Sequence, residues 1–416
     1  MSEKPHRRAH EATMRTDAVR GDTGVSVRSR CLEGRKVILA VSGGIAAVES
    51  VRLGRELRRH GASVFAMMTR GAEKVISSLA LSWGSGSEVL TEWEPEMSQL
   101  GRFDGLLLAP ATRNTIAKHV HGIIDSPVMM ALSAAKGNGT PLMLVPSMHD
   151  DLFHDGVTEA LLVSLESTGS HVLVNQSTEG RRKQPDPRTI VSNFCNIINC
   201  HLPNRRRVAV TLGANRAPID AIRSIQNTST GRSGWHISEH LFRMGHEVIC
   251  IVGDTSAHPS FQLPDVRTDP SPNGMLSLCT DLATSPNPPE AWIHSAAVLD
   301  FIPEGNHDGK KASGDEAWDL RLLPGPKHIS ELSPLVRGCT RVGFKLEVEE
   351  SENALIDSAM TQITQYGLDA VVANLLSEVK AGRRPRCRLV RPNGDVSSLQ
   401  DELEMCEAIE ALIAEN

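Results

Sequence analysis

Apolar residues along this chain gather in short runs, and the segments between the runs show helical spacing. In the first half, these runs predict buried strands at residues 37–41, 63–69, 105–110, 141–146 and 171–175, with a helix expected around 188–200. Between the first two strands, Ala46, Leu53 and Leu57 recur at the spacing of one helix face. Strands that alternate with helices in this way predict a parallel sheet with helices on both faces.

The same alternation restarts after a polar stretch. Residues 176–206 are polar and then basic (QSTEGRRKQPDP, HLPNRRR), which indicates a domain boundary near residue 203. Beyond it, strands are predicted at 208–213, 246–253, 291–301, 340–347, 368–375 and 387–392, and a closing helix at 400–414. The predicted fold is α/β with two doubly wound, mainly parallel-sheet domains, one flavodoxin-like or Rossmann-like over 35–202 and one Rossmann-like over 203–416.

Composition agrees with two domains and excludes some classes of protein. A chain of 416 residues is too long for one ordinary core, and 40% hydrophobic with 23% charged residues is typical of soluble globular proteins. The chain has no apolar run long enough to predict a membrane-spanning helix. A net charge of -6 argues against a nucleic-acid partner, which requires a clustered positive surface. Residues 1–34 are Arg-rich without an apolar signal segment, so they predict a disordered tail, with a nucleic-acid-binding arm as the alternative.

Cysteine and histidine spacing gives no metal site. The 8 cysteines are scattered without a C-x-x-C pair, which predicts reduced thiols in a cytoplasmic protein rather than a disulfide framework. The 16 histidines include no H-E-x-x-H motif or comparable ligand cluster, so the sequence assigns no metal ligands.

The stretch VSGGIAAVES (residues 41–50) joins a predicted strand to a predicted helix. Gly43 and Gly44 let the backbone approach an anion, and free N–H groups at a helix start favour negative charge. An ordinary turn between a strand and a helix also needs small residues here, so Ser42 and the two glycines alone leave both interpretations open. The third glycine of the dinucleotide fingerprint is missing, which favours a mononucleotide such as a flavin phosphate.

Two later strand ends also carry polar side chains. APATRNTIAK places Thr112, Asn114 and Thr115 at the carboxyl end of a strand, where open α/β sheets bind ligands. The alternative is that Thr112 or Asn114 caps the following helix. VPSMHDDLF places His149 in the same row, although an isolated histidine is more often structural.

The second domain carries a denser polar loop within IDAIRSIQNTSTGRSG (219–234). Its hydroxyl and backbone donors suit a nucleoside triphosphate or an acyl phosphate without a Walker lysine, and a capped helix start is the alternative. Residues 303–316 are too polar to pack and predict a mobile loop, whose Lys310 is either a phosphate contact or a solvated lysine. Lys345 lies in an apolar strand, which indicates that it faces a partner.

The order of these motifs resembles that of the bifunctional phosphopantothenoylcysteine decarboxylase/phosphopantothenate–cysteine ligase family of coenzyme A biosynthesis. VSGGIAAVES, MMTRGA, APATRNTIAK and VPSMHDDLF resemble its flavoprotein half. IDAIRSIQNTSTGRSG, HSAAVLDF, GKKAS, VGFKLE and VVANLLSE resemble its ligase half. The resemblance spans roughly residues 35 to 412, and the segment P-S-M-H is similar to that of the archaeal branch.

The resemblance implies two reactions. The ligase half would use CTP and Mg²⁺ to activate 4′-phosphopantothenate as an acyl-cytidylate, which the amine of cysteine attacks. The flavin half would then use FMN to oxidise the cysteinyl thiol, so that carbon dioxide leaves and the product is reduced back to 4′-phosphopantetheine. Asn227 and Lys310 match catalytic positions of the ligase. The matched FMN contacts are Ser42, Gly43, Gly44, Thr69, Thr112, Asn114 and Thr115, and the matched nucleotide contacts are Ser229, Thr230, Gly231, Asp300, Lys310, Phe344, Lys345 and Asn374.

Three departures concern the decarboxylase. Glu96 stands where the family usually has a histidine, and the segment NQSTEGRRKQPDP lacks the reactive cysteine of many bacterial members. His149 replaces an asparagine that binds the substrate carboxylate. His149 and Glu96 are therefore the candidate catalytic groups of this half, and a ligase with an inactive flavin domain is the alternative function.

Two further classes fit fewer of the motifs. A flavoprotein reductase or prenyltransferase-like enzyme would share the first domain but lack the second. A non-catalytic nucleotide-binding protein would not need Asn227, Asp300 and Lys310 together. The resemblance also implies a homo-oligomer built from trimers of the flavin domain and dimers of the ligase domain.

Overall fold

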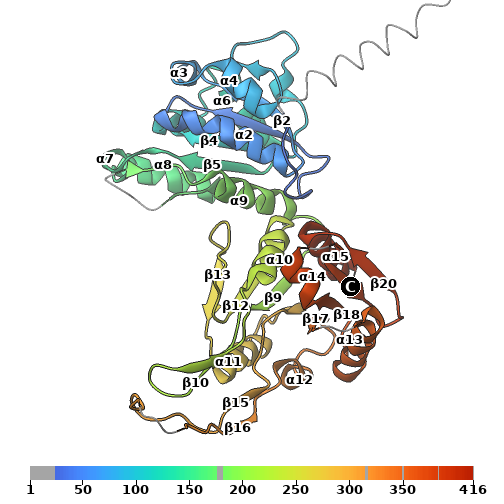
Figure 1. Ribbon diagram of the computed structural model, residues 1–416. Helices are drawn as coiled ribbons and strands as arrows, with labels where there is room; N and C mark the ends of the chain where they lie inside the picture. Colours follow the sequence, from blue (N-terminus) through green and yellow to red (C-terminus); the bar gives the residue numbers. More distant parts are fainter. Residues whose placement is uncertain (1–23, 176–180, 314–316, 349–350, 383, 416) are drawn as a thin grey trace, which may run out of the picture. The chain divides into compact units, whose positions relative to one another are not determined.

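The computed structural model describes residues 24–175, 181–313, 317–348, 351–382 and 384–415. The chain divides into two compact units, Met1–Ile198 and Asn199–Asn416 (Figure 1). Residues 1–23 of the predicted tail lie outside the described residues. None of the described helices is long and apolar enough to cross a membrane.

The first unit is built on a six-stranded parallel sheet with strand order β3-β2-β1-β4-β5-β7. The strands are β1 (Lys36–Val41), β2 (Ser63–Met68), β3 (Val89–Leu90), β4 (Gly105–Ala111), β5 (Leu142–Pro146) and β7 (His171–Val172). A separate antiparallel pair joins β6 (Met148–His149) to β8 (Arg181–Arg182). The predicted α/β class and parallel sheet are confirmed.

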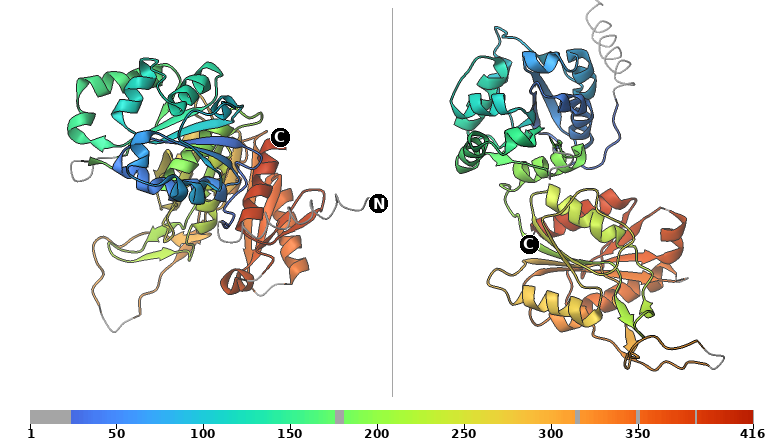
Figure 2. Two further views of the ribbon diagram at one scale, coloured as in Figure 1. Left: turned by 90° about the horizontal axis from the view of Figure 1, so that it is seen from above. Right: turned by 90° about the vertical axis from the view of Figure 1, so that its left-hand side faces the viewer.

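Helices cover both faces of this sheet (Figure 2). They are η1 (Ile45–Glu49), α2 (Ser50–Arg59), α3 (Arg70–Glu73), α4 (Ser78–Ser85), η2 (Ser98–Leu100), α5 (Arg113–Val120), α6 (Pro127–Gly137), α7 (Asp150–Phe153), α8 (Gly156–Ser167) and α9 (Pro187–Asn199). Side chains of α5, α6 and α8 pack with alternate residues of β1 and β4, such as Ile38 and Leu106. On the opposite face α9 approaches β4, where Gly105 lies against Phe194 and Ile198.

Three details of the first unit differ from the sequence prediction. Residues 24–34, assigned to the disordered tail, are ordered here: Leu32 is fully buried and its N–H donates to the His60 carbonyl. In the first helical segment Ala47 is buried and Ala46 is not, because η1 is a 3₁₀ turn that shifts the phase of the apolar face. The last predicted strand is shorter than expected and stops at Val172.

The second unit is built on an eight-stranded sheet with order β13-β12-β9-β14-β17-β18-β19-β20, parallel except for the last two strands. These strands are β9 (Arg207–Leu212), β12 (Glu247–Val252), β13 (Asp265–Thr268), β14 (Ala291–His294), β17 (Thr340–Glu347), β18 (Ala370–Leu375), β19 (Cys387–Val390) and β20 (Val396–Leu399). The helices are α10 (Arg232–Arg243), α11 (Pro272–Ala283), α12 (His328–Leu332), α13 (Glu352–Tyr366), α14 (Leu376–Ala381) and α15 (Glu402–Glu415). Apolar clusters on both sheet faces form the core of this unit.

Two antiparallel pairs lie apart from this sheet. They are β10 (Arg216–Pro218) with β11 (Ser224–Gln226), and β15 (Phe301–Pro303) with β16 (Leu322–Pro324). The prediction of a single strand over 291–301 was therefore wrong. β14 ends at His294, and the following segment bends over the sheet edge, where the Ser295 hydroxyl donates to the Thr211 carbonyl at 2.6 Å.

Candidate functional site

In the first unit the polar loops singled out in the sequence follow the carboxyl ends of parallel strands, whereas the Asn227 loop of the second unit follows β11, a strand of an antiparallel pair. In the first unit they follow β1, β2, β4 and β5, which are adjacent in the sheet. Because parallel strands end at the same edge, this topology collects segments that are far apart in sequence.

Ser42 joins the ends of β1 and β4. Its buried hydroxyl donates to the Pro110 carbonyl at 2.7 Å and accepts from the Thr112 N–H at 2.8 Å. Both hydrogen-bonding capacities of this hydroxyl are thus used within the protein. Ser42 therefore holds the two loops together, and its side chain lines neither of the pockets described below.

Gly43 is required by close packing of two backbones. A Cβ atom at Gly43 would lie 2.5 Å from the carbonyl carbon of Gly71, where no side chain fits. Thr69 stands beside this contact, and its hydroxyl caps α3 by accepting from the Ala72 N–H at 3.3 Å. A Cβ atom at Gly44 would meet the Thr112 methyl at 3.4 Å and the Pro110 ring at 4.0 Å, so Gly44 is less constrained by packing.

A cavity of about 490 Å³, here called the threonine pocket, opens at this edge. Its walls include Gly43, Thr69, Arg70, Thr91, Glu92, Thr112, Asn114, Thr115, Lys118 and Ser126. The hydroxyls of Thr112 and Thr115 lie 3.0 Å apart. Within the described residues no side chain caps α5 at Thr112, which leaves first-turn N–H groups for an anion. Hydrogen bonding to Arg70 lowers the pKa of Glu92 in the same wall.

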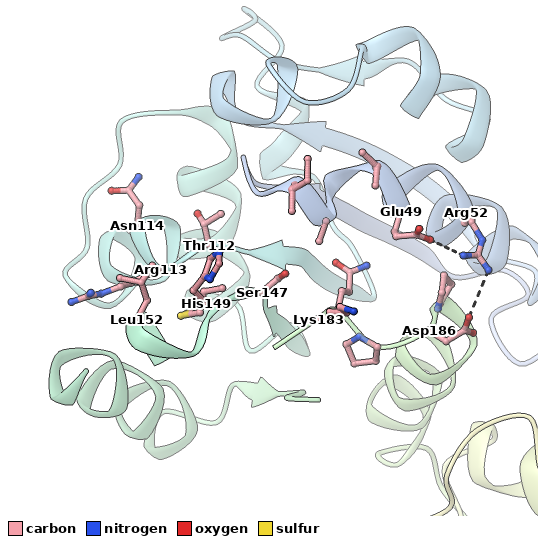
Figure 3. Close-up of a pocket in the computed structure, with 17 residues that line it drawn as sticks. Glu49, Arg52, Thr112, Arg113, Asn114, Ser147, His149, Leu152, Lys183 and Asp186 are labelled. Carbon is pink, nitrogen blue, oxygen red and sulfur yellow. Dashed lines mark hydrogen bonds and ion pairs between the residues drawn. The ribbon is translucent and has the colours of Figure 1, made fainter. Parts of the chain in front are cut away.

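A second cavity of about 890 Å³, here called the His149 pocket, shares Thr112 and Asn114 with the threonine pocket. Figure 3 shows Thr112, Arg113, Asn114, Ser147, His149 and Leu152 on one side of it. Across the pocket Arg52 pairs with Glu49 at 2.8 Å and with Asp186 at 3.6 Å, near the exposed Lys183. The two pockets therefore meet at one wall, with His149 in the larger of them.

Glu96 is the one predicted catalytic residue of this unit that the structure does not bring to either pocket. It lies exposed in a turn after β3, and neither cavity includes it among its walls. Sequence reasoning missed Arg52 and Lys183, which face His149 across the larger pocket. The polar stretch EGRRKQPDP carried a signal for Lys183, whereas Arg52 lies on a helix whose motif indicated only an apolar face.

In the second unit the loop around Asn227 leads into α10. Gly231 is the N-cap of this helix at φ of 75°, and a Cβ there would meet the Thr255 methyl at 2.5 Å. The hydroxyls of Ser229 and Thr230 accept from the N–H groups of Gly231 and Arg232, each at 3.3 Å. The amide of Asn227 donates to the Ala297 carbonyl at 3.0 Å, which ties the loop to the segment after β14.

Arg386 connects this loop to the end of β18. Its guanidinium donates to the Asn374 amide oxygen at 3.0 Å and to the Ser233 hydroxyl at 3.0 Å. Glu402 lies 3.9 Å from the same guanidinium. Asn374 is 7% exposed, so its orientation is set by Arg386. No motif indicated Arg386, which follows other arginines in a segment of no assigned role.

Lys345 and Phe344 point to opposite faces of β17. Phe344 packs against the core cluster that contains α10 and α15, whereas Lys345 lines a cavity of about 420 Å³ beside α13. Lys327 lines the same cavity, and its ammonium lies 3.8 Å from the Asp300 carboxylate. Lys327 therefore links the two predicted residues, because it contacts Asp300 and lines the same cavity as Lys345. The sequence had not indicated Lys327.

Lys310 lies in the loop that follows β15. This loop is held to the turn after β10, because the N–H of Ala221 donates to the Gly309 carbonyl and that of Lys311 to the Asp220 carboxylate. Lys311 packs 4.6 Å from the Trp318 ring centre, while the side chain of Lys310 is exposed. The predicted mobile loop thus leaves Lys310 rather than Lys311 available. No group of three metal-binding side chains occurs in the parts of the chain that the structure describes.

Comparison with known proteins finds a family match for each of the two units. The protein family described as Flavoprotein matches residues 25–199, and the DNA/pantothenate metabolism flavoprotein C-terminal domain matches residues 204–414. The coenzyme A biosynthesis bifunctional protein CoaBC of Thermococcus kodakarensis is 34% identical over 358 residues, 84% of this chain and 88% of the relative. The chain belongs to the CoaBC family.

Other CoaBC proteins show the same extent of similarity. That of Methanocaldococcus jannaschii is 31% identical over 84% of this chain and 86% of its own length, and that of Bacillus subtilis 28% over 84% and 87%. The predicted family and its archaeal-like character are confirmed, and the chain is an enzyme of coenzyme A biosynthesis. The Flavoprotein match starts before the predicted domain start at residue 35, in agreement with the buried Leu32.

Proposed function

We propose that this CoaBC family member joins 4′-phosphopantothenate to cysteine in its second unit and decarboxylates the product in its first. The observation that carries the proposal is that the family matches run through both units. In the first unit the polar loops also gather at one sheet edge. Ligation would proceed through an acyl-cytidylate with release of pyrophosphate, followed by attack of the cysteine amine.

In the ligase unit the Asn227 loop is proposed to bind the acyl intermediate and the start of α10 to bind phosphate. Lys345 and Lys327 supply positive charge in one cavity, which suits the triphosphate of CTP. Lys310 would approach the same ligand from its exposed loop. Mg²⁺ is proposed to enter bound to the triphosphate, because divalent magnesium usually keeps substrate phosphates as ligands.

In the first unit the threonine pocket is proposed to bind FMN. Its hydroxyls, the Asn114 amide and the uncapped N–H groups of α5 are donors that suit the phosphate and the polar edge of a flavin. The flavin would accept electrons from the cysteinyl thiol and return them after carbon dioxide leaves. His149 and Lys183 line the adjoining pocket, where they would bind and orient the substrate carboxylate.

The assembly is proposed to be a homo-oligomer of flavin-unit trimers and ligase-unit dimers. Within one chain Glu96 lies outside both pockets, so it would contribute to decarboxylation only from a neighbouring copy. A catalytic role of Glu96 therefore requires that the protein forms the proposed oligomer.

The two reactions are tested separately with the purified full-length protein. It is supplied with 4′-phosphopantothenate, cysteine, CTP and Mg²⁺, and pyrophosphate and carbon dioxide are followed independently. We expect both products in equal amounts. Pyrophosphate without carbon dioxide from flavin-containing protein would support a ligase with an inactive flavin domain. Absence of pyrophosphate with every nucleotide would contradict the proposal.

Variants assign each reaction to its unit. Asn227→Asp is expected to lose most amide formation while keeping its flavin, and His149→Leu to keep pyrophosphate release while losing carbon dioxide. If His149→Leu leaves carbon dioxide release unchanged, His149 has no part in the reaction.

A further inference from the structure

A compact cluster of reactive side chains lies in the first unit away from both pockets. The sulfur atoms of Cys31 and Cys195 lie 3.5 Å apart, although the residues are 164 positions apart in sequence. Cys31 precedes β1 in a turn, and Cys195 lies in α9. Exposure is 5% for Cys31 and 0% for Cys195.

Two polar side chains also lie close to the Cys31 sulfur. The Ser29 hydroxyl lies 2.9 Å from it and the His60 Nδ1 3.8 Å from it, and Ser29 and His60 are 2.6 Å apart. The His60 Nε2 lies 3.5 Å from the Glu56 carboxylate, which also accepts from Arg59 at 3.0 Å. Through these contacts the thiol proton of Cys31 can pass to His60. The positive charge on His60 is then balanced by the Cys31 thiolate and the Glu56 carboxylate.

This environment distinguishes Cys31 from other cysteines of the chain. Burial raises the pKa of Cys31, but hydrogen bonds from Cys195, His60 and Ser29 and the charge of His60 outweigh it, so the pKa lies well below its usual value. Burial raises the pKa of Cys250 and of Cys279 to about 12. Since the thiolate is the nucleophile, Cys31 is the thiol best prepared for oxidation.

We propose that Cys31 and Cys195 form an oxidative modification site that hydrogen peroxide closes to a disulfide. The Cys31 thiolate attacks one peroxide oxygen and becomes a sulfenic acid, and the hydroxide released takes up a proton to give water. The Cys195 thiol then attacks the Cys31 sulfur, displacing a second water. In total two thiols and one peroxide give one disulfide and two waters.

The geometry requires only a small movement. Bond formation brings the sulfurs from 3.5 Å to about 2 Å, which a rotation of the Cys31 side chain can supply because this residue lies in a turn. Cys195 is held in α9 and stays in place. The bond would join the segment before the first strand to the last helix of the unit.

The test uses purified full-length protein that has been fully reduced. It is exposed to hydrogen peroxide at increasing molar ratios, blocked with an alkylating reagent and digested without reduction, and the peptides are identified by mass spectrometry. We expect the Cys31–Cys195 peptide pair to appear before any other oxidised cysteine, at a rate about tenfold higher. The oxidised protein should melt about 5 °C or more above the reduced form, since the bond closes a long loop.

Matched variants separate this site from general oxidation. Cys195→Ser is expected to abolish the crosslink and leave a Cys31 sulfenic acid that a dimedone probe captures. Cys200→Ser, which removes a more exposed thiol just beyond α9, should leave the crosslink unchanged. His60→Gln should slow crosslinking about tenfold, with folding of each variant checked by circular dichroism. Oxidation of Cys200 or Cys339 ahead of Cys31, or a dimedone adduct on Cys31 that never yields the crosslink in the parent protein, would overturn the proposal.

Discussion

At the scale of single residues, Arg386 sets the orientation of the Asn374 amide. A guanidinium only donates hydrogen bonds, so the amide oxygen of Asn374 must point to Arg386, as the 3.0 Å contact shows. The NH₂ group of the amide therefore points away from Arg386 and is left as a donor. The sequence located Asn374 from its motif, but this orientation depends on a residue that follows it in the chain and has no motif of its own.

This arrangement predicts the effect of removing the guanidinium. Arg386→Leu is expected to reduce kcat/KM for the nucleotide about ten- to a hundredfold, mainly through KM, because the Asn374 amide becomes free to turn. Arg386→Lys should recover part of the loss. Arg384→Leu, an exposed arginine of the same segment, is the matched control. Equal effects of the variants at positions 384 and 386 would contradict the positioning role.

Ser42 is a second residue with a positioning role, because its hydroxyl holds the loop after β1 to the loop after β4. Ser42→Ala removes the hydroxyl that accepts from the Thr112 N–H in a buried site, and it leaves the Pro110 carbonyl with only the backbone N–H of residue 42 as donor. We expect a loss of about 1–3 kcal/mol in the free energy of unfolding and weaker flavin retention. Urea titration and flavin absorbance measure the two effects. Ser167→Ala, at an exposed helix end, should change neither.

At the scale of secondary-structure elements, apolar runs bounded by turn residues were located well from sequence. The strand predicted over 340–347 matches β17 at both ends, because each of its limits is marked by polar residues. The single strand predicted over 291–301 was wrong because its apolar residues serve two different purposes. Those of β14 are buried in the sheet, whereas the alanines after β14 are small because the chain passes close to the segment after β9. The short strands β10, β11 and β13 escaped prediction because exposed side chains leave no apolar pattern.

The contact between the turns after β1 and β2 gives a prediction at this scale. Gly43→Ala places a methyl against the Gly71 backbone, so the turns must separate, and we expect a loss of about 2 kcal/mol in unfolding free energy. Gly137→Ala is the matched control. It lies at the end of α6 with no atom within 4 Å of the added Cβ, so it should be neutral or stabilising by up to about 1 kcal/mol. Thermal melting of both variants measures the difference.

At the scale of the whole molecule, each unit buries a histidine in its neutral form. Burial, together with the charge of Lys136, lowers the pKa of His119 to about 4. Burial, then the charges of Arg341 and His328, lowers the pKa of His294 to about 3. In the unfolded chain these histidines bind protons below about pH 6.5, so unfolding takes up protons and stability falls as the pH is lowered from about 6.5 towards 3.

His294→Phe should therefore flatten the pH dependence of the second unit. Stability at about pH 4.5 is expected to improve relative to that at pH 7 by about 2 kcal/mol, because one proton-binding group is removed from the unfolded state. Urea unfolding between pH 4 and 7 measures this slope. The exposed His258→Phe is the control and should retain the slope of the parent protein. A parallel slope in both variants would exclude His294 as its cause.

Sequence reasoning placed the candidate residues of the first unit after β1, β2, β4 and β5, because parallel strands fix where their ends meet. It could not show that Glu96 lies away from His149, since no pattern in TEWEPEMSQL indicates which way that turn faces. It also could not find Lys327, whose relation to Asp300 arises from the folding back of β16 on β15. The residues that could not be predicted are those whose contacts join different loops, because such contacts leave no periodic pattern in the sequence.

Thr112 and Asn114 form part of the wall of both cavities in the first unit. A ligand in the larger cavity that reaches this shared wall touches side chains that also line the smaller cavity. If the smaller cavity holds a flavin, the visible absorption of that flavin reports whether the larger cavity is occupied. Substrate analogues can then be ranked by the shift they cause in visible absorption, without any turnover.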